Sequence, residues 1–153
     1  MKKFISFLLC SATLWLSPSF VFAENKILQT QDSNFKEIKV QMIECKRKGD
    51  VLTIKLNFYN PSDRESEACI CDDNGGYWRF YVIAGDKKYF ILKDDKGAPL
   101  APIYEGIAQR FKIAPKGSHK WWGKFPAPPK EIKSITFIMP EVMPFEDIPI
   151  TDE

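Results

Sequence analysis

The sequence lacks the motifs on which most common enzyme active sites are built. Its 153 residues contain a single histidine, His119, and no His-Glu-X-X-His segment of the kind that binds catalytic zinc. No serine nucleophile motif stands beside His119, and no glycine-rich phosphate-binding loop follows a strand pattern. The paired acidic residues lie among turn formers, where solvated charge is expected. We therefore expect a protein that is not an enzyme and has neither a cofactor nor a metal site.

The chain also lacks an amphipathic helix pattern, internal repeats and a surplus of one charge. Its formal net charge is +2, and Lys2 and Lys3 of the N-terminal segment account for this excess. Without a basic surplus, no general attraction to nucleic acid or to an anionic membrane is expected. Many short alternating segments without a helix pattern indicate an all-β protein.

The first 23 residues have the features of a secretory signal peptide. Met1-Lys2-Lys3 is basic, Phe4–Leu16 is apolar, and Val21-Phe22-Ala23 ends in a small residue, which predicts cleavage before Glu24. The double lysine and the compact segment suggest a bacterial protein that is secreted or periplasmic. The alternative reads the same apolar stretch as a membrane anchor, but Ser17-Pro18-Ser19 argues against it. No membrane span is therefore expected after cleavage.

Residues Asp50–Pro61 contain the clearest structural pattern in the chain. The large apolar side chains fall on every second position, at Leu52, Ile54, Leu56 and Phe58. This period predicts a strand with one face in the core and the other toward water. Phe35–Cys45 shows a similar alternation, and the charged segment Lys46–Asp50 joins the two stretches. We expect an antiparallel hairpin with a turn at that charged segment.

The remainder of the chain predicts further short strands separated by turns rich in glycine, proline and aspartate. These strands are expected within Tyr77–Ala84, Lys88–Lys93, Arg110–Ile113, Ser118–Phe125, the stretch of Ile135 to Met139, and Phe145–Ile150. In the first of them, Trp78, Phe80 and Val82 are expected on one face. About seven strands predict one antiparallel β-sandwich domain over residues 35–153, preceded by a flexible N-terminal arm over residues 24–34.

Three segments of this domain give a further indication of its fold. They are Lys88-Tyr89-Phe90-Ile91-Leu92-Lys93-Asp94, Lys124-Phe125-Pro126-Ala127-Pro128-Pro129 and Pro144-Phe145-Glu146-Asp147-Ile148-Pro149-Ile150. They resemble recurring segments of secreted bacterial immunoglobulin-like (telokin-like) domains of unknown function. The resemblance covers about Val40 to Ile150 and implies an immunoglobulin-like β-sandwich. It carries over no catalytic residue, and the cysteines are not part of the pattern.

Three cysteines follow the signal segment, at Cys45, Cys69 and Cys71. In an oxidising compartment they allow one disulfide, with the pairings Cys45–Cys69, Cys45–Cys71 and Cys69–Cys71. Cysteines two residues apart on an extended chain can be bridged only with local distortion, so a bond from Cys45 is favoured. The alternative is a soft-metal or redox pair at Cys69 and Cys71, which Cys45 and His119 could complete as ligands.

The adjacent residues Trp121 and Trp122 must face opposite sides of their predicted strand. One can fill the core, and the other is expected to be exposed among the polar residues His119, Lys120 and Lys124. An exposed aromatic ring surrounded by cations is a candidate contact for a sugar, a peptide or a partner protein. The alternative is that this ring packs beneath the stiff segment Pro126–Pro129.

These patterns favour a secreted, non-catalytic module that acts by protein or surface contact in the bacterial envelope. An exposed edge strand or the Trp122 region would make that contact, and the partner would be a protein or an envelope surface component. The alternative function, of a different class, is a periplasmic thiol-redox or copper-handling protein that uses Cys69 and Cys71.

Overall fold

The computed structural model describes residues 26–70, 77–102 and 110–153, which form strands and turns without a helix. The expected signal peptide over residues 1–23 lies outside this described part. Among the residues described, no helix is long and apolar enough to cross a membrane. The described residues form eleven strands: β1 (Gln29–Asp32), β2 (Lys39–Lys48), β3 (Val51–Tyr59), β4 (Ser66–Cys69), β5 (Tyr81–Ala84), β6 (Lys87–Phe90), β7 (Arg110–Ile113), β8 (Ser118–Pro126), β9 (Ser134–Ile138), β10 (Phe145–Pro149) and β11 (Thr151–Asp152).

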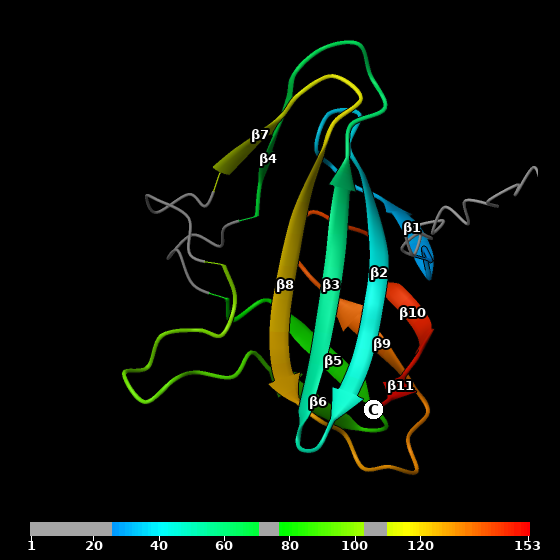
Figure 1. The fold of residues 1–153 in the computed structure, drawn as a ribbon, viewed down its shortest axis with the longest axis vertical. Coiled ribbons are helices and arrows are strands. Elements are labelled where there is room, and N and C mark those ends of the chain that lie inside the picture. The colour runs from blue at the N-terminus through cyan, green and yellow to red at the C-terminus, as the bar shows by residue number, and fades with distance from the viewer. Residues whose placement is uncertain (1–25, 71–76, 103–109) are drawn as a thin grey trace, which may run out of the picture.

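The larger sheet has the order β1-β2-β3-β8, and β11 pairs with β2 as well (Figure 1). The hairpin of β2 and β3 confirms the strongest expectation from the sequence, and Gly49 at its turn has a φ of 56° that suits glycine. The apolar residues on alternate positions of β3 are all 0% exposed: Leu52, Ile54, Leu56 and Phe58. Burial of this whole row places β3 at the centre of the core.

A second sheet, of order β10-β9-β5-β6, lies behind the larger one in Figure 1. The two sheets share one hydrophobic core, in which the indole of Trp121 from β8 stacks with the ring of Phe80 at 5.4 Å and that of Phe137 from β9 at 6.1 Å between centroids. Strands β4 and β7 form a separate antiparallel pair. The expected all-β, antiparallel character is confirmed, apart from β11, which runs parallel to β2.

The described residues contain eleven strands, whereas the sequence predicts about seven. The structure also differs from the sequence expectations in the following segments. Part of the expected flexible arm, Gln29–Asp32, is a strand that pairs antiparallel with β2, because backbone hydrogen bonds need no apolar pattern. Trp78 does not share the buried face with Phe80 and Val82, since its side chain is 61% exposed. Arg47, expected in a charged turn, lies within β2 and is only 3% exposed.

The buried guanidinium of Arg47 joins three distant parts of the chain. Its Nε and Nη2 donate to the two carboxylate oxygens of Asp152, at 2.5 Å and 3.1 Å. Its Nη1 donates to the carbonyl oxygens of Pro128 and Pro129, at 3.1 Å and 2.9 Å. A two-pronged arginine–carboxylate pair of this geometry is among the stronger polar contacts in proteins. Arg47 therefore fixes both the proline segment after β8 and the strand β11.

We expect Arg47→Ala to lower the free energy of unfolding by about 3 kcal/mol, because it leaves a set of carbonyl groups without their donor. Urea denaturation followed by tryptophan fluorescence measures the change. The matched control is Lys48→Ala on the same strand, whose ion pair with Glu153 is solvent-exposed and should change the free energy by less than about 0.5 kcal/mol. Equal effects of the two substitutions would contradict the role assigned to Arg47.

The same contact predicts a pH dependence, because the hydrogen bond from Arg47 lowers the pKa of Asp152. A carboxyl group with a lowered pKa stabilises the fold above its ordinary pKa, and that contribution is lost as the pH falls through the lowered value. The difference in unfolding midpoint between the wild type and Asp152→Asn should therefore be largest near neutral pH and shrink on acidification. A difference that grows on acidification would reverse the sign and contradict the assignment.

Candidate functional site

Two hollows with aromatic walls adjoin the second sheet. The first is about 470 Å³, and its described lining residues are Tyr77, Trp78, Phe90, Ile91, Lys93, Gly97 and Pro99. The second is about 350 Å³ and is lined by Trp78, Arg79, Tyr81, Lys88, Phe90, Ile138, Met139 and Pro140. Trp78 and Phe90 line both hollows. We call the side chains of Tyr77, Trp78, Tyr81 and Phe90 the aromatic surface.

A turn before β5 brings Trp78 to the surface. The N–H of Phe80 donates to the carbonyl of Tyr77 at 3.0 Å, which bends the chain and places Trp78 and Arg79 at the corner. The rings on either side are buried and meet edge to face, with 4.8 Å between the centroids of Tyr77 and Phe80. The Tyr77 hydroxyl also donates to the carbonyl of Pro102. The corner is therefore held by anchored residues on both sides.

The β5–β6 hairpin supplies the other side of the aromatic surface. Tyr81 and Phe90 are partners in the hairpin register, and their ring centroids are 5.9 Å apart. The side chains of Trp78 and Phe90 are 61% and 50% exposed, although both are large aromatic rings. Ladder pairing of β5 and β6 thus holds Phe90 in place although its ring faces water.

Three cations, Arg79, Lys88 and Lys93, line the two hollows. The guanidinium carbon of Arg79 lies 5.9 Å from the centroid of the Trp78 ring, and the Nζ of Lys88 lies 4.5 Å from that of Tyr81. Neither of these cations, nor Lys93, forms an ion pair with another residue in the described ranges. Aromatic faces offer apolar contact, and unpaired cations attract anions. The site is thus suited to a ligand or surface with both an apolar and an anionic part.

The adjacent tryptophans Trp121 and Trp122 lie on β8, at the edge of the larger sheet. Trp121 is 1% exposed and Trp122 is 39% exposed, which confirms that they face opposite sides. Gly123 allows the Trp121 ring to pack in the core, because a Cβ at this position would lie 2.6 Å from that ring. Lys120 and Lys124 are exposed on the same face as Trp122.

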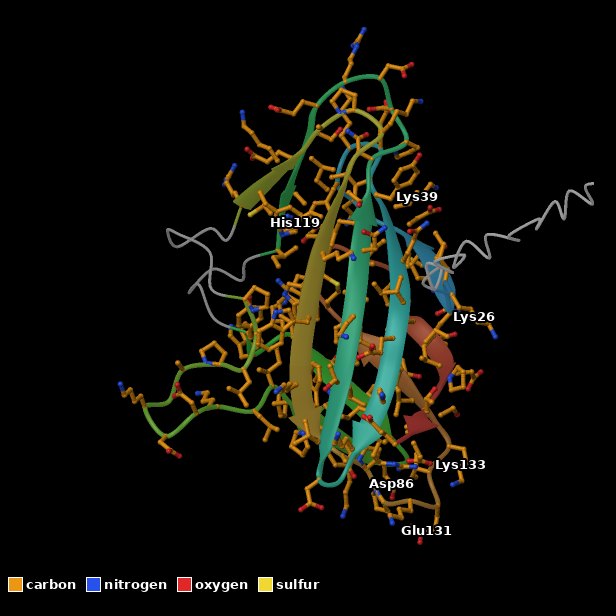
Figure 2. The ribbon with its side chains drawn as sticks, in the orientation of Figure 1. Lys26, Lys39, Asp86, His119, Glu131 and Lys133 are labelled. Carbon is orange, nitrogen blue, oxygen red and sulfur yellow. The ribbon has the colours of Figure 1, made fainter. Side chains whose placement is uncertain are left out.

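His119 does not belong to this exposed set. Its ring faces the other side of β8 and stacks on Phe111 of β7, with 4.0 Å between centroids, and Figure 2 shows it on the side of β8 near β4 and β7. Partial burial lowers the pKa of His119. Of the five residues proposed from the sequence around the tryptophans, the structure brings Lys120, Trp122 and Lys124 together on one face and places His119 and Trp121 on the other.

The favoured disulfide from Cys45 is not present. Cys45 lies in β2 with a free thiol that is 1% exposed, and burial raises its pKa to about 12. Cys69 ends β4, whose partner is β7, so the two residues lie on different sheets. Cys71 lies outside the described residues. Because the inward face of β2 is covered by the core, the Cys45 thiol packs as an apolar group. Cys45 and Cys69, the two described cysteines of the proposed metal or redox set, lie on different sheets.

In the part of the chain that the structure describes, no three histidine, cysteine or acidic side chains lie close enough to hold a metal ion. Comparison of the chain with protein-family models, with curated proteins and with solved structures finds no match in any of the three. The residues and their geometry are therefore the basis for a functional proposal.

Sequence reasoning missed the aromatic surface. The alternation of Trp78, Phe80 and Val82 placed Trp78 on the same face as the other two, because nothing in that pattern marks the bend between Tyr77 and Phe80. The usable signal was the clustering of aromatic and basic residues on both arms of one short hairpin. One buried row of side chains would need fewer aromatic residues and no basic ones.

We expect the thiol of Cys45 to resist alkylation in the native protein. A rise in pKa from 9.0 to about 12 lowers its thiolate fraction near pH 8 by about a thousandfold, and burial also blocks access. Peptide mass spectrometry after iodoacetamide treatment, with and without urea, measures the modification of this residue. Labelling of native Cys45 at a rate close to that in urea would contradict its buried position.

Proposed function

We propose that the protein is a secreted, non-catalytic, immunoglobulin-like β-sandwich module that contacts a protein or surface component of the bacterial envelope through the aromatic surface. The observation that carries this proposal is the exposure of Trp78 and Phe90, which are shared by two adjacent hollows. Rings held in exposed positions by anchored neighbours favour binding with little loss of side-chain entropy. The signal-like N-terminus and the resemblance to secreted bacterial domains support the location and the fold type.

The chemistry of the lining residues supports contact rather than catalysis. Among the described residues of the two hollows, the polar side chains are those of tyrosine, lysine and arginine. These groups can bind and orient an anion, and the described lining has none of the carboxylate, imidazole and thiol groups that most often act as general bases or nucleophiles. The contact partner therefore carries negative charge next to an apolar or ring-shaped part.

Photo-crosslinking tests this contact in the intact bacterial envelope. A photoreactive benzoylphenylalanine at position 90 or 78 should give a discrete adduct, because both side chains face the partner. The matched control is position 27, since Ile27 is 47% exposed and Phe90 is 50% exposed but Ile27 lies outside the aromatic surface. The double variant Arg79→Glu with Lys88→Glu should reduce the adduct at position 90 at least fivefold.

The same preparation reports on location, since the purified protein should have the mass of a chain that begins at Glu24. Identical adducts from positions 90 and 27, or no adduct from positions 78 and 90, would contradict the proposed contact. A mass that includes residues 1–23 would contradict the proposed signal peptide. The crosslinking result would still test the proposed contact independently.

A further inference from the structure

Strand β8 has one edge that is only partly covered. It pairs with β3 on one side along its whole length, and it ends the order of the larger sheet. Near the end of β8, the N–H of Leu92 donates to the carbonyl of Lys124 at 2.8 Å, and the N–H of Lys124 donates to the carbonyl of Leu100 at 3.0 Å. Both backbone groups of Lys124 thus point away from β3.

The direction of these groups fixes the direction of others on the same strand. In an antiparallel ladder, the backbone groups of successive residues point alternately toward the partner strand and away from it. The β3–β8 register runs without a shift, so the N–H and C=O groups of Trp122 and Lys120 point the same way as those of Lys124. Within the described ranges, no backbone hydrogen bond from another segment reaches them. Among the described residues, this stretch of β8 is therefore an open strand edge.

The side chains beside the open edge have one sign of charge. Lys120 and Lys124 flank Trp122 on the outer face, and neither lysine forms an ion pair with a described residue. The cation opposite Trp122, Lys55 of β3, is paired with Glu44 at 2.9 Å. The edge therefore combines free backbone groups with an exposed ring and two unpaired lysines.

We propose that the open edge of β8, over Ser118–Trp122, accepts an extended acidic segment of a partner protein as an additional strand. The backbone groups of Lys120 and Trp122 would give the affinity, and acidic residues on alternate positions would lie beside Lys120 and diagonal to Lys124, whose own backbone groups are already bonded. Edge-to-edge pairing with a second copy of β8 is disfavoured, because it would bring these lysines against each other. This site is distinct from the aromatic surface and does not depend on the function proposed for it.

A pair of synthetic peptides tests the proposal on the folded chain that begins at Glu24. The probes are acetyl-Glu-Val-Glu-Val-Glu-Val-amide and the matched peptide with lysine in place of glutamate, titrated at millimolar concentration. Nuclear magnetic resonance should show that the acidic peptide slows amide hydrogen exchange at Lys120 and Trp122 at least tenfold. The amides of Trp121 and Gly123, which bond to β3, should already be protected without peptide. The lysine peptide should leave exchange at all four amides unchanged.

Two substitutions at one position separate backbone pairing from charge. Lys120→Pro removes an N–H that points to the open edge, where proline is tolerated, and should abolish binding of the acidic peptide. Lys120→Ala keeps the N–H and removes the same charge, so it should weaken binding only severalfold. Equal binding by Lys120→Pro and Lys120→Ala would overturn the proposal, as would binding of both peptides alike or of neither.

A charge-reversal variant keeps the test decisive if Lys120→Pro does not fold. Lys120→Glu combined with Lys124→Glu leaves the backbone unchanged and should reverse the preference between the two peptides. The lysine peptide should then protect the amides of residues 120 and 122. An unchanged preference for the acidic peptide in this variant would overturn the proposal.

Discussion

The structure depends on the way Trp121 is held between the two sheets. Its indole lies across the bare backbone of Gly123 and stacks on Phe80 and Phe137, so one side chain links β8 with the second sheet. Offset and edge-on contacts between aromatic rings of this kind add to the free energy gained by burial. Because the position next to Trp121 must then face outward, the core itself places Trp122 in water.

The same cluster controls the aromatic surface. Phe80 stacks on Trp121 and meets Tyr77 edge to face, so the two ends of the turn that carries Trp78 and Arg79 are fixed in the core. The exposed ring of Trp78 is therefore attached to a turn whose two ends are held in the core. A single buried network thus sets the positions of two different surfaces, one at the β5–β6 hairpin and one along β8. Both surfaces combine aromatic rings with cations, although one is a pair of hollows and the other an edge of backbone groups.

Local pattern was enough to predict the regular strands but not the bends and long-range contacts. The alternation in β3 is unambiguous because Leu52 to Phe58 all face one core, and the hairpin with β2 follows from the short turn at Gly49. Arg47 is a charged residue next to a predicted turn, so the sequence predicted that its side chain is exposed to solvent. Its burial depends on carbonyl groups of the segment after β8 and on the carboxylate of Asp152, which no local pattern places there.

The candidate site was only partly accessible to sequence reasoning for the same reason. Opposite facing of Trp121 and Trp122 follows from strand geometry alone, and it was predicted. Which backbone edge of β8 stays open depends on where Leu92 and Leu100 cross it, and which face Trp78 takes depends on one turn hydrogen bond. Burial of Cys45 depends on the packing of β2 against the core. The sequence shows only that Cys69 and Cys71 follow it along the chain, which favoured a disulfide.

The unbonded Cys45 has a consequence for where this chain can fold. Its thiol fills space in the core as a methyl-sized group would, and no cross-link from it joins β2 to the rest of the domain. Closure of the β2–β3 hairpin therefore depends on no disulfide bond from Cys45. Assembly of the larger sheet is a matter of apolar burial and ladder pairing, and those driving forces are the same in a reducing solution as in an oxidising one.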